Sequence, residues 1–342
     1  MQRRNENYFF YMLKGIACFL VITVHYPMQG KYGEMIRIFA RCAVPMFFII
    51  SGRYMYGTGR ADTPGMRKKL IRRFVRLSLI TLGVLMVYTL YSFVFYRAQG
   101  MSVQEWIHMK YQKSQWLFLL MMNSGQIVWD YSYVYDFMWY LFATLWVLLF
   151  MIVTLKWSAE IKMAICIALM SMLYVCQYMH YSGTLSMIHL FCGDMWFYRN
   201  WLFTGIPFTL VGVWIGEMDV NKAPKPLVWW TLAACGVYLA VREAIHFETR
   251  ELSIGIGMLT IALSVLAEYY PRFGSRLLAF VGKHLSATIY YWHVMIGAAL
   301  GLVLDDSSAV FSILVMGCSL LLSLIVYGMK KAILHKRRKC VA

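Results

Sequence analysis

Ten apolar stretches, each long enough to cross a lipid bilayer, restrict the fold of this chain more than any other feature. A membrane-spanning helix needs about 20 predominantly apolar residues, with a range of about 17–25. We therefore predict an all-α, polytopic membrane protein with about ten transmembrane helices. The predicted spans are residues 8–28, 36–56, 74–96, 134–155, 161–178, 200–217, 226–245, 252–268, 284–304 and 308–330.

The composition agrees with this fold class. The chain of 342 residues is 61% hydrophobic and only 14% charged, whereas soluble domains carry about 25% charged residues. We interpret residues 1–342 as a single integral-membrane domain that ends in a basic tail at 330–342. The first apolar run follows a charged start, as in a signal peptide, but its length and its polar residues predict a retained span.

The distribution of basic residues predicts the orientation, because Lys and Arg collect on the cytoplasmic side of a membrane protein. With the N-terminus inside, 22 of the 33 Lys and Arg residues lie on the predicted cytoplasmic side, in loops or at the ends of spans, and eight lie on the outer side. We therefore predict that both termini are cytoplasmic. The same distribution accounts for the net charge of +17 without a nucleic-acid partner.

The eight cysteines indicate neither a disulfide framework nor a metal site. They form no C-x-x-C pair, and most of them fall inside apolar runs. Cysteine behaves there as a small hydrophobic residue. We expect no bound metal.

The first predicted span contains two ionisable residues, Lys14 and His25, within LKGIACFLVITVHYPM. At about 100° per residue, eleven steps bring both side chains to one helix face, about 16 Å apart along the axis. Ionisable groups inside a membrane are costly and often functional. The structural alternative is a lysine that extends to the inner surface and a histidine at the outer end. We take both residues as catalytic candidates. Acidic residues that could orient His25 are Glu105, Asp130, Asp136 and Asp194.

A second basic feature, KKLIRRFVR, opens the third span. Lys69, Arg72, Arg73 and Arg76 follow one another at i, i+3, i+4 and i+7 and therefore share one helix face. Phased arginines can bind phosphates through pairs of hydrogen bonds, although basic residues also gather at cytoplasmic helix ends without any ligand. We call these four residues the basic row and predict that they bind phosphate.

Other residues in the spans suggest helix distortion, close packing or a cavity. Pro45 should loosen the second span and free backbone groups. Gly212 and Gly216 have the spacing that lets two helices approach closely. Candidates for lining a substrate cavity are Arg41, Ser51, Trp139, Tyr140 and His293.

Several motifs occur in a fixed order along the chain, and together they resemble acyltransferase family three, a family of integral-membrane acyltransferases. Within it, the chain is most similar to stand-alone O-acetyltransferases of bacterial envelope glycans, and it is also similar to the membrane half of serine-racemase-type resistance proteins. The pattern differs at Tyr11, usually an aspartate, and at Phe137, often a histidine. The matching motifs are Lys14 with His25, VPMFFIISG (44–52), Arg73 with Arg76, MWYLFATL (138–145), PFTLVGVWIG (207–216) and YYWH (290–293).

The resemblance implies a multi-pass enzyme of the bacterial cytoplasmic membrane. It would transfer an acyl group, most often acetyl, from cytoplasmic acyl-CoA to a hydroxyl of an extracytoplasmic or lipid-linked glycan, with no permanently bound cofactor. The basic row would hold the phosphates of coenzyme A, and Lys14 would meet the pantetheine arm or the thioester oxygen. His25 would take the acceptor proton, or carry the acyl group itself. The alternative is a small-molecule transporter or a non-catalytic membrane module that uses the same polar face.

Overall fold

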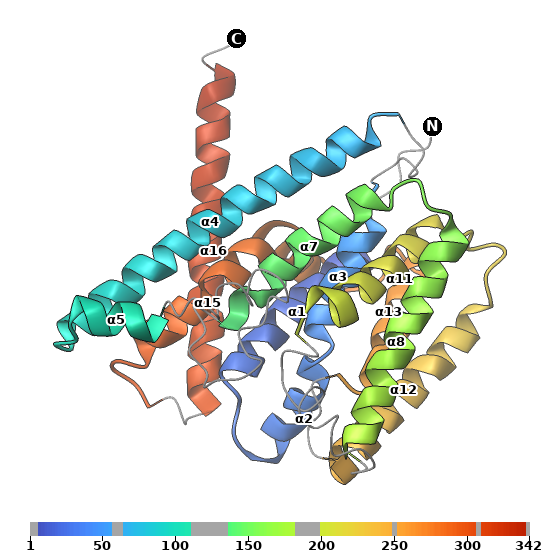
Figure 1. Ribbon diagram of the computed structural model, residues 1–342, viewed down its shortest axis with the longest axis horizontal. Coiled ribbons are helices and arrows are strands. Elements are labelled where there is room, and N and C mark those ends of the chain that lie inside the picture. Colours follow the sequence, from blue (N-terminus) through green and yellow to red (C-terminus); the bar gives the residue numbers. More distant parts are fainter. Residues whose placement is uncertain are drawn as a thin grey trace. The chain divides into compact units, whose positions relative to one another are not determined.

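The computed structural model describes residues 6–56, 64–110, 136–181, 199–247, 252–305 and 309–339 (Figure 1). Every regular element within these ranges is a helix, and they contain no strand. The predicted all-α class is therefore confirmed. The chain divides into two compact units, of which the first comprises residues 1–47 and 220–342 and the second residues 48–219.

The first unit is built around α1. This helix packs against α14, against the π-helical turn η3 and against α15, and α15 packs in turn against α16. Two further helices, α12 and α13, lie side by side (Figure 1). The elements are α1 (Tyr8–His25), α2 (Gly30–Ala40), α12 (Pro226–Phe247), α13 (Ile254–Tyr269), α14 (Arg276–Phe280), η3 (Val281–Leu285), α15 (Ser286–Leu300) and α16 (Ala309–Lys339).

The second unit contains the long helix α4, which packs against α7, and the pair α8 and α11, which pack against each other. The helix α3 (Ala43–Arg53) contributes its residues from Phe48 onward to this unit. The other elements are α4 (Met66–Ala98), α5 (Val103–Lys110), η1 (Asp136–Met138), α7 (Trp139–Val153), α8 (Ala159–Tyr181), η2 (Trp201–Gly205) and α11 (Ile206–Glu217).

Each of the ten predicted spans contains a helix, and the described helices are those of a membrane protein. Among the described residues, six helical segments are long and apolar enough to cross a bilayer, and three apolar helices are shorter. The count of ten spans and the cytoplasmic termini stay predictions. The six long segments are Tyr8–His25, Gly30–Arg53, Met66–Ala98, Ala159–Met179, Pro226–His246 and Val310–Leu334, and the three shorter helices are Trp139–Val153, Trp201–Glu217 and Ile254–Tyr269.

The second predicted span is interrupted, and Pro45 explains where. The helix α2 ends at Ala40 and α3 begins at Ala43. In a continuous helix the proline ring would clash with the carbonyl four residues earlier, that of Arg41. The break removes this clash, because it places Pro45 in the first turn of a new helix, where proline is tolerated. The predicted loosening of this span is therefore confirmed.

Two glycines, Gly52 on α3 and Gly212 on α11, shape the contact between these helices. A Cβ atom on Gly212 would overlap the carbonyl oxygen of Ile49, and a Cβ on Gly52 would overlap that of Thr209. The backbones of α3 and α11 therefore touch, and the predicted packing role of Gly212 is confirmed.

Candidate active site

The helix α1 carries both catalytic candidates, Lys14 and His25, and runs without interruption from Tyr8 to His25. Asn7 fixes its start, because its side chain accepts the N–H of Phe10 at 3.0 Å and donates to the carbonyl of Ala267 at 2.6 Å. The helix ends at His25 because the next residue, Tyr26, precedes a proline, which disfavours the helical conformation, and Tyr26 is not helical. The two candidates therefore share one helix, as predicted.

Tyr26 fastens the end of α1 to its neighbours in the first unit. Its hydroxyl donates to the carbonyl of Val294 at 2.8 Å, and its carbonyl accepts a hydrogen bond from the hydroxyl of Ser312. The tyrosine ring occupies the space beside Gly297, where any Cβ atom would overlap it. These contacts hold the backbone next to His25. No sequence motif drew attention to Tyr26.

His25 lies beside His293, one of the predicted cavity candidates. The ring centroids are 5.2 Å apart and the rings are inclined by 52°. His25, at the end of α1, is half-buried. His293, on α15, is completely buried, with an exposed fraction of 0%. The fold thus pairs an accessible imidazole with an inaccessible one.

The backbone of α15 sets the tautomer of His293. Its Nδ1 atom lies 2.8 Å from the carbonyl oxygen of Tyr290 and 3.2 Å from that of Ile289. A carbonyl oxygen can only accept a hydrogen bond, so Nδ1 carries the proton and donates. The neutral ring then has its lone pair on Nε2. His293 can therefore offer an acceptor nitrogen within the protein interior.

Lys14 is half-buried on α1. Within the described ranges it makes no hydrogen bond and no ion pair. One helical turn further, the thiol of Cys18 donates to the carbonyl of Ser286 at 3.7 Å. The helix approaches η3 closely here, because a Cβ atom on Gly15 or on Gly282 would overlap backbone carbonyls. A partly desolvated ammonium group in this position favours an anion or a polar oxygen as its partner.

The structure separates the basic row into two pairs. Lys69 donates to the carbonyl of Tyr56 at 3.1 Å. Arg73 donates through Nη1 to the carbonyls of Tyr54 at 3.1 Å and Met55 at 2.6 Å. These carbonyls follow the last turn of α3, so Lys69 and Arg73 together cap the end of that helix.

The other two residues of the basic row, Arg72 and Arg76, are exposed. In the part of the chain that the structure describes, neither makes a hydrogen bond or an ion pair. They lie four residues apart on α4 and therefore on neighbouring positions of one face. This exposed pair has its guanidinium donors available for a ligand.

The remaining cavity candidates lie at helix ends and junctions. Trp139 and Tyr140 open α7 and pack on the ring of Phe48, at centroid distances of 6.4 and 4.8 Å. Ser51 is half-buried on α3, within the second unit. Arg41 is half-buried in the first unit, at the junction of α2 and α3.

The positions that depart from the family pattern have packing roles. The ring of Tyr11 lies under the ammonium group of Lys283, 5.6 Å from its centroid to Nζ. Lys283 also donates to the carboxylate of Glu6 at 2.5 Å, and this hydrogen bond raises the pKa of Lys283. Phe137 is buried against Tyr88, with 4.7 Å between the ring centroids.

Of the acidic residues considered as partners of His25, Glu105 has a structural role. Its carboxylate accepts the N–H of Ser102 at 2.8 Å, and the hydroxyl of Ser102 accepts the N–H of Glu105 at 3.2 Å. This capping box opens α5 and lowers the pKa of Glu105. Asp130 and Asp194 lie outside the described residues. Within the described ranges, no group of three His, Cys, Asp or Glu residues could hold a metal ion.

Comparison with known proteins identifies the family of this chain. The acyltransferase domain of family three matches residues 7–328, which is nearly the whole chain. No curated protein and no solved structure matches it. The matched range covers both α1, with Lys14 and His25, and α15, with His293. The chain therefore belongs to acyltransferase family three and is a membrane acyltransferase.

Proposed function

We propose that this enzyme transfers an acetyl group from cytoplasmic acetyl-CoA to a hydroxyl of an extracytoplasmic or lipid-linked glycan, in the bacterial cytoplasmic membrane. Family membership supports acyl transfer. The proposed chemistry rests on the pair formed by His25 and His293. The centroid of the half-buried His25 ring lies 5.2 Å from that of the fully buried His293 ring.

His25 acts as the general base in this scheme. Its ring nitrogen takes the proton of the acceptor hydroxyl while the hydroxyl oxygen attacks the carbonyl carbon of the thioester. The C–O bond forms, and the carbonyl oxygen carries the negative charge of a tetrahedral intermediate. The C–S bond then breaks, and the departing thiolate takes the proton from His25. The products are the acetyl ester and coenzyme A, and the enzyme returns to its starting state.

His293 positions His25 rather than touching the substrate. It is fully buried, and its Nδ1–H is held by the carbonyls of Tyr290 and Ile289. Its Nε2 lone pair can therefore accept a hydrogen bond and stabilise a positively charged neighbouring ring. In other acyl-transfer enzymes, a hydrogen-bond acceptor next to the catalytic histidine orients its ring and stabilises the imidazolium in the same way.

Lys14 supplies positive charge to the reaction. A half-buried ammonium group without a described protein partner is suited to a developing oxyanion or to the thioester oxygen. Because the site is partly desolvated, such an interaction is stronger than it would be in water. Loss of this charge should lower the turnover number more than it alters the binding of the donor.

Arg72 and Arg76 are the residues that we assign to the phosphates of coenzyme A. They are exposed and have no described partner, whereas Lys69 and Arg73 are engaged by carbonyls. Guanidinium groups bind phosphate oxygens through two parallel hydrogen bonds. The basic row therefore combines a pair that caps α3 with a pair that can bind the donor.

Two substitutions of the buried histidine test the proposed chemistry. His293→Asn keeps an amide N–H near the position of Nδ1 and removes the acceptor at Nε2, whereas His293→Gln places an amide near Nε2. We expect His293→Asn to reduce kcat by about tenfold to a hundredfold with an unchanged KM for acetyl-CoA, and His293→Gln to retain more activity. The assay measures release of the coenzyme A thiol by the full chain in lipid vesicles.

The same vesicles separate acyl transfer from transport. The enzyme should release coenzyme A only when an acceptor glycan is present, and mass spectrometry should find the acetyl ester on that glycan. Equal kcat values for wild type and both His293 variants would contradict the positioning role. Uptake of a small molecule in the absence of acetyl-CoA, without thiol release, would contradict the proposed function as a whole.

A further inference from the structure

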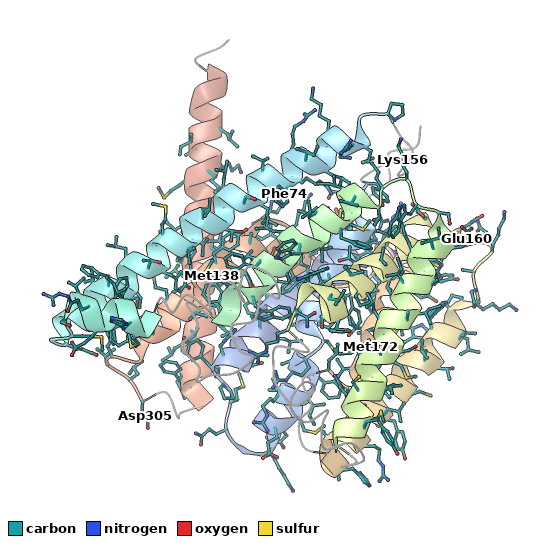
Figure 2. All side chains as sticks on the ribbon, viewed as in Figure 1. Phe74, Met138, Lys156, Glu160, Met172 and Asp305 are labelled. Carbon is teal, nitrogen blue, oxygen red and sulfur yellow. The ribbon has the colours of Figure 1, made fainter. Side chains whose placement is uncertain are left out.

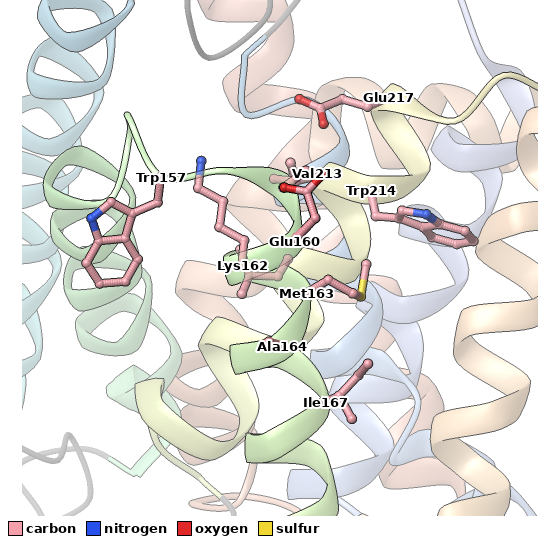
Figure 3. A pocket seen from close by; sticks show the side chains of 11 residues that line it. Trp157, Glu160, Lys162, Met163, Ala164, Ile167, Val213, Trp214 and Glu217 are labelled. Atoms are coloured by element: carbon pink, nitrogen blue, oxygen red, sulfur yellow. The ribbon is translucent and has the colours of Figure 1, made fainter.

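The second unit contains a cavity of about 590 Å³ between α8 and α11 (Figure 3). None of the residues assigned to acyl transfer lines it. Its walls include two carboxylates, Glu160 and Glu217, and two indole rings, Trp157 and Trp214. A cavity of this size and composition can hold part of an amphiphilic ligand.

The cavity changes from acidic to apolar along its length. On α8, Met163 and Ile167 follow Glu160 at helical spacing. On α11, the apolar Leu210 lies seven residues before Glu217. Seven residues of helix correspond to about 10 Å. Figure 3 shows both carboxylates near one end and Ile167 toward the other. The walls therefore match a ligand with a cationic head and an apolar tail.

The acidic end of the cavity coincides with the end of a predicted membrane span. The apolar segment Ala159–Met179 has 21 residues, which is about 31 Å of helix and matches the hydrocarbon thickness of a bilayer. Glu160 lies in its first turn, and Met172 lies further along the same helix (Figure 2). Trp157 is 44% exposed and Trp214 is 36% exposed, as is common for indole rings at the headgroup level.

The charges of the residues that line the cavity favour a positively charged headgroup. Both carboxylates are exposed, whereas Lys162 is only 7% exposed and its Nζ donates to the carbonyl of Leu155 at 3.4 Å. The three charged residues sum to a negative charge in a chain whose net charge is +17. Carboxylates and indole faces both attract an ammonium group. An anionic headgroup, or the phosphates of coenzyme A, would meet the two carboxylates instead.

We propose that this cavity binds a zwitterionic phospholipid. Its ammonium group lies between Glu160 and Glu217 and beside an indole ring, and one acyl chain follows the apolar walls formed by Met163, Ile167 and Leu210. The site is separate from the proposed chemistry, so its occupancy is testable without an activity assay.

A photocrosslinking competition tests the headgroup preference. The probe is a phosphatidylethanolamine with a diazirine in its acyl chain, added to the purified full chain in detergent and mapped by mass spectrometry of peptides. We expect labels within residues 157–167 and 210–217. Unlabelled phosphatidylethanolamine should displace the probe at least about tenfold more effectively than phosphatidylglycerol, as expected for one charge-assisted hydrogen bond.

Matched variants locate the source of that preference. In the double variant Glu160→Gln and Glu217→Gln, the ratio of the two displacing concentrations should fall to about one. Glu34→Gln is the control, because it makes the same change in another cavity, between α2 and α12. Absence of labels in the two segments, or an equal effect of both lipids on wild type, would overturn the proposal. A preference that persists in the double variant would also overturn it.

Discussion

Substitutions of Arg73 and Arg76 should have different consequences, although both residues belong to one Arg-x-x-Arg motif. Arg73 donates hydrogen bonds to the carbonyls of Tyr54 at 3.1 Å and Met55 at 2.6 Å. Arg76 is exposed and has no such partner in the described ranges. Arg73→Met should therefore affect the fold of the second unit, whereas Arg76→Met should affect donor binding.

The size of each effect follows from the contacts. A hydrogen bond that involves a charged group contributes about 1.5–3 kcal/mol. Arg73 makes two of them, and its half-buried position reduces their sum, so we expect Arg73→Met to cost about 2–4 kcal/mol and to lower the Tm by about 5 °C or more. Arg76→Met should leave the Tm unchanged and raise the KM for acetyl-CoA about tenfold, through the loss of one phosphate contact.

Two measurements on the same preparations check this prediction. Thermal unfolding in detergent gives the Tm of each variant, and initial rates of coenzyme A release give the KM for acetyl-CoA. If the Tm of Arg73→Met equalled that of the wild type, the stabilising role of Arg73 at the end of α3 would be refuted. An unchanged KM for Arg76→Met would show that the exposed arginines reflect only the general excess of basic residues at cytoplasmic helix ends.

Two further predictions concern packing and topology. Gly212→Val should disrupt the contact between α3 and α11, because the added Cβ overlaps the carbonyl of Ile49, and we expect a clear loss of folded protein on size exclusion. Gly83→Ala is its control, since nothing lies within 4 Å of a Cβ there; a folded Gly212→Val would contradict the close approach. For the topology, a single cysteine at Ser114 in a cysteine-free chain should react with an impermeant thiol reagent from outside, and one at Thr58 should not. Outside labelling at position 58 would invert the predicted orientation.

The helices were predictable from the sequence because their signal is local. Runs of apolar residues of sufficient length predict helices in a membrane, and each predicted span contains one. Pro45 also indicated a distortion, and the break after Ala40 follows from the geometry of its ring. The number of crossings was not determined in this way, because α7, α11 and α13 are shorter than a full span.

The contacts of the candidate site depend on tertiary structure and were only partly predictable. Helical spacing placed the basic row on one face, but it could not show that Arg73 meets carbonyls 18 and 19 residues earlier in the chain. The apolar run predicted that Lys14 and His25 lie on one helix, and their spacing predicted a common face of that helix. The proximity of His25 and His293 arises from packing between α1 and α15, and a single sequence contains no local pattern for such a contact.

In the proposed reaction, His25 takes the proton of the acceptor hydroxyl during acyl transfer. The most direct test compares wild type with His25→Ala, both as full chains reconstituted in lipid vesicles with acetyl-CoA and an acceptor glycan. His25→Ala should fold and insert normally, because a small neutral residue replaces a half-buried one at a helix end. We expect its rate of coenzyme A release to fall by about a hundredfold or more, with no acetyl ester detectable on the glycan. Acetyl transfer at the wild-type rate by His25→Ala would contradict the role of His25 as the general base.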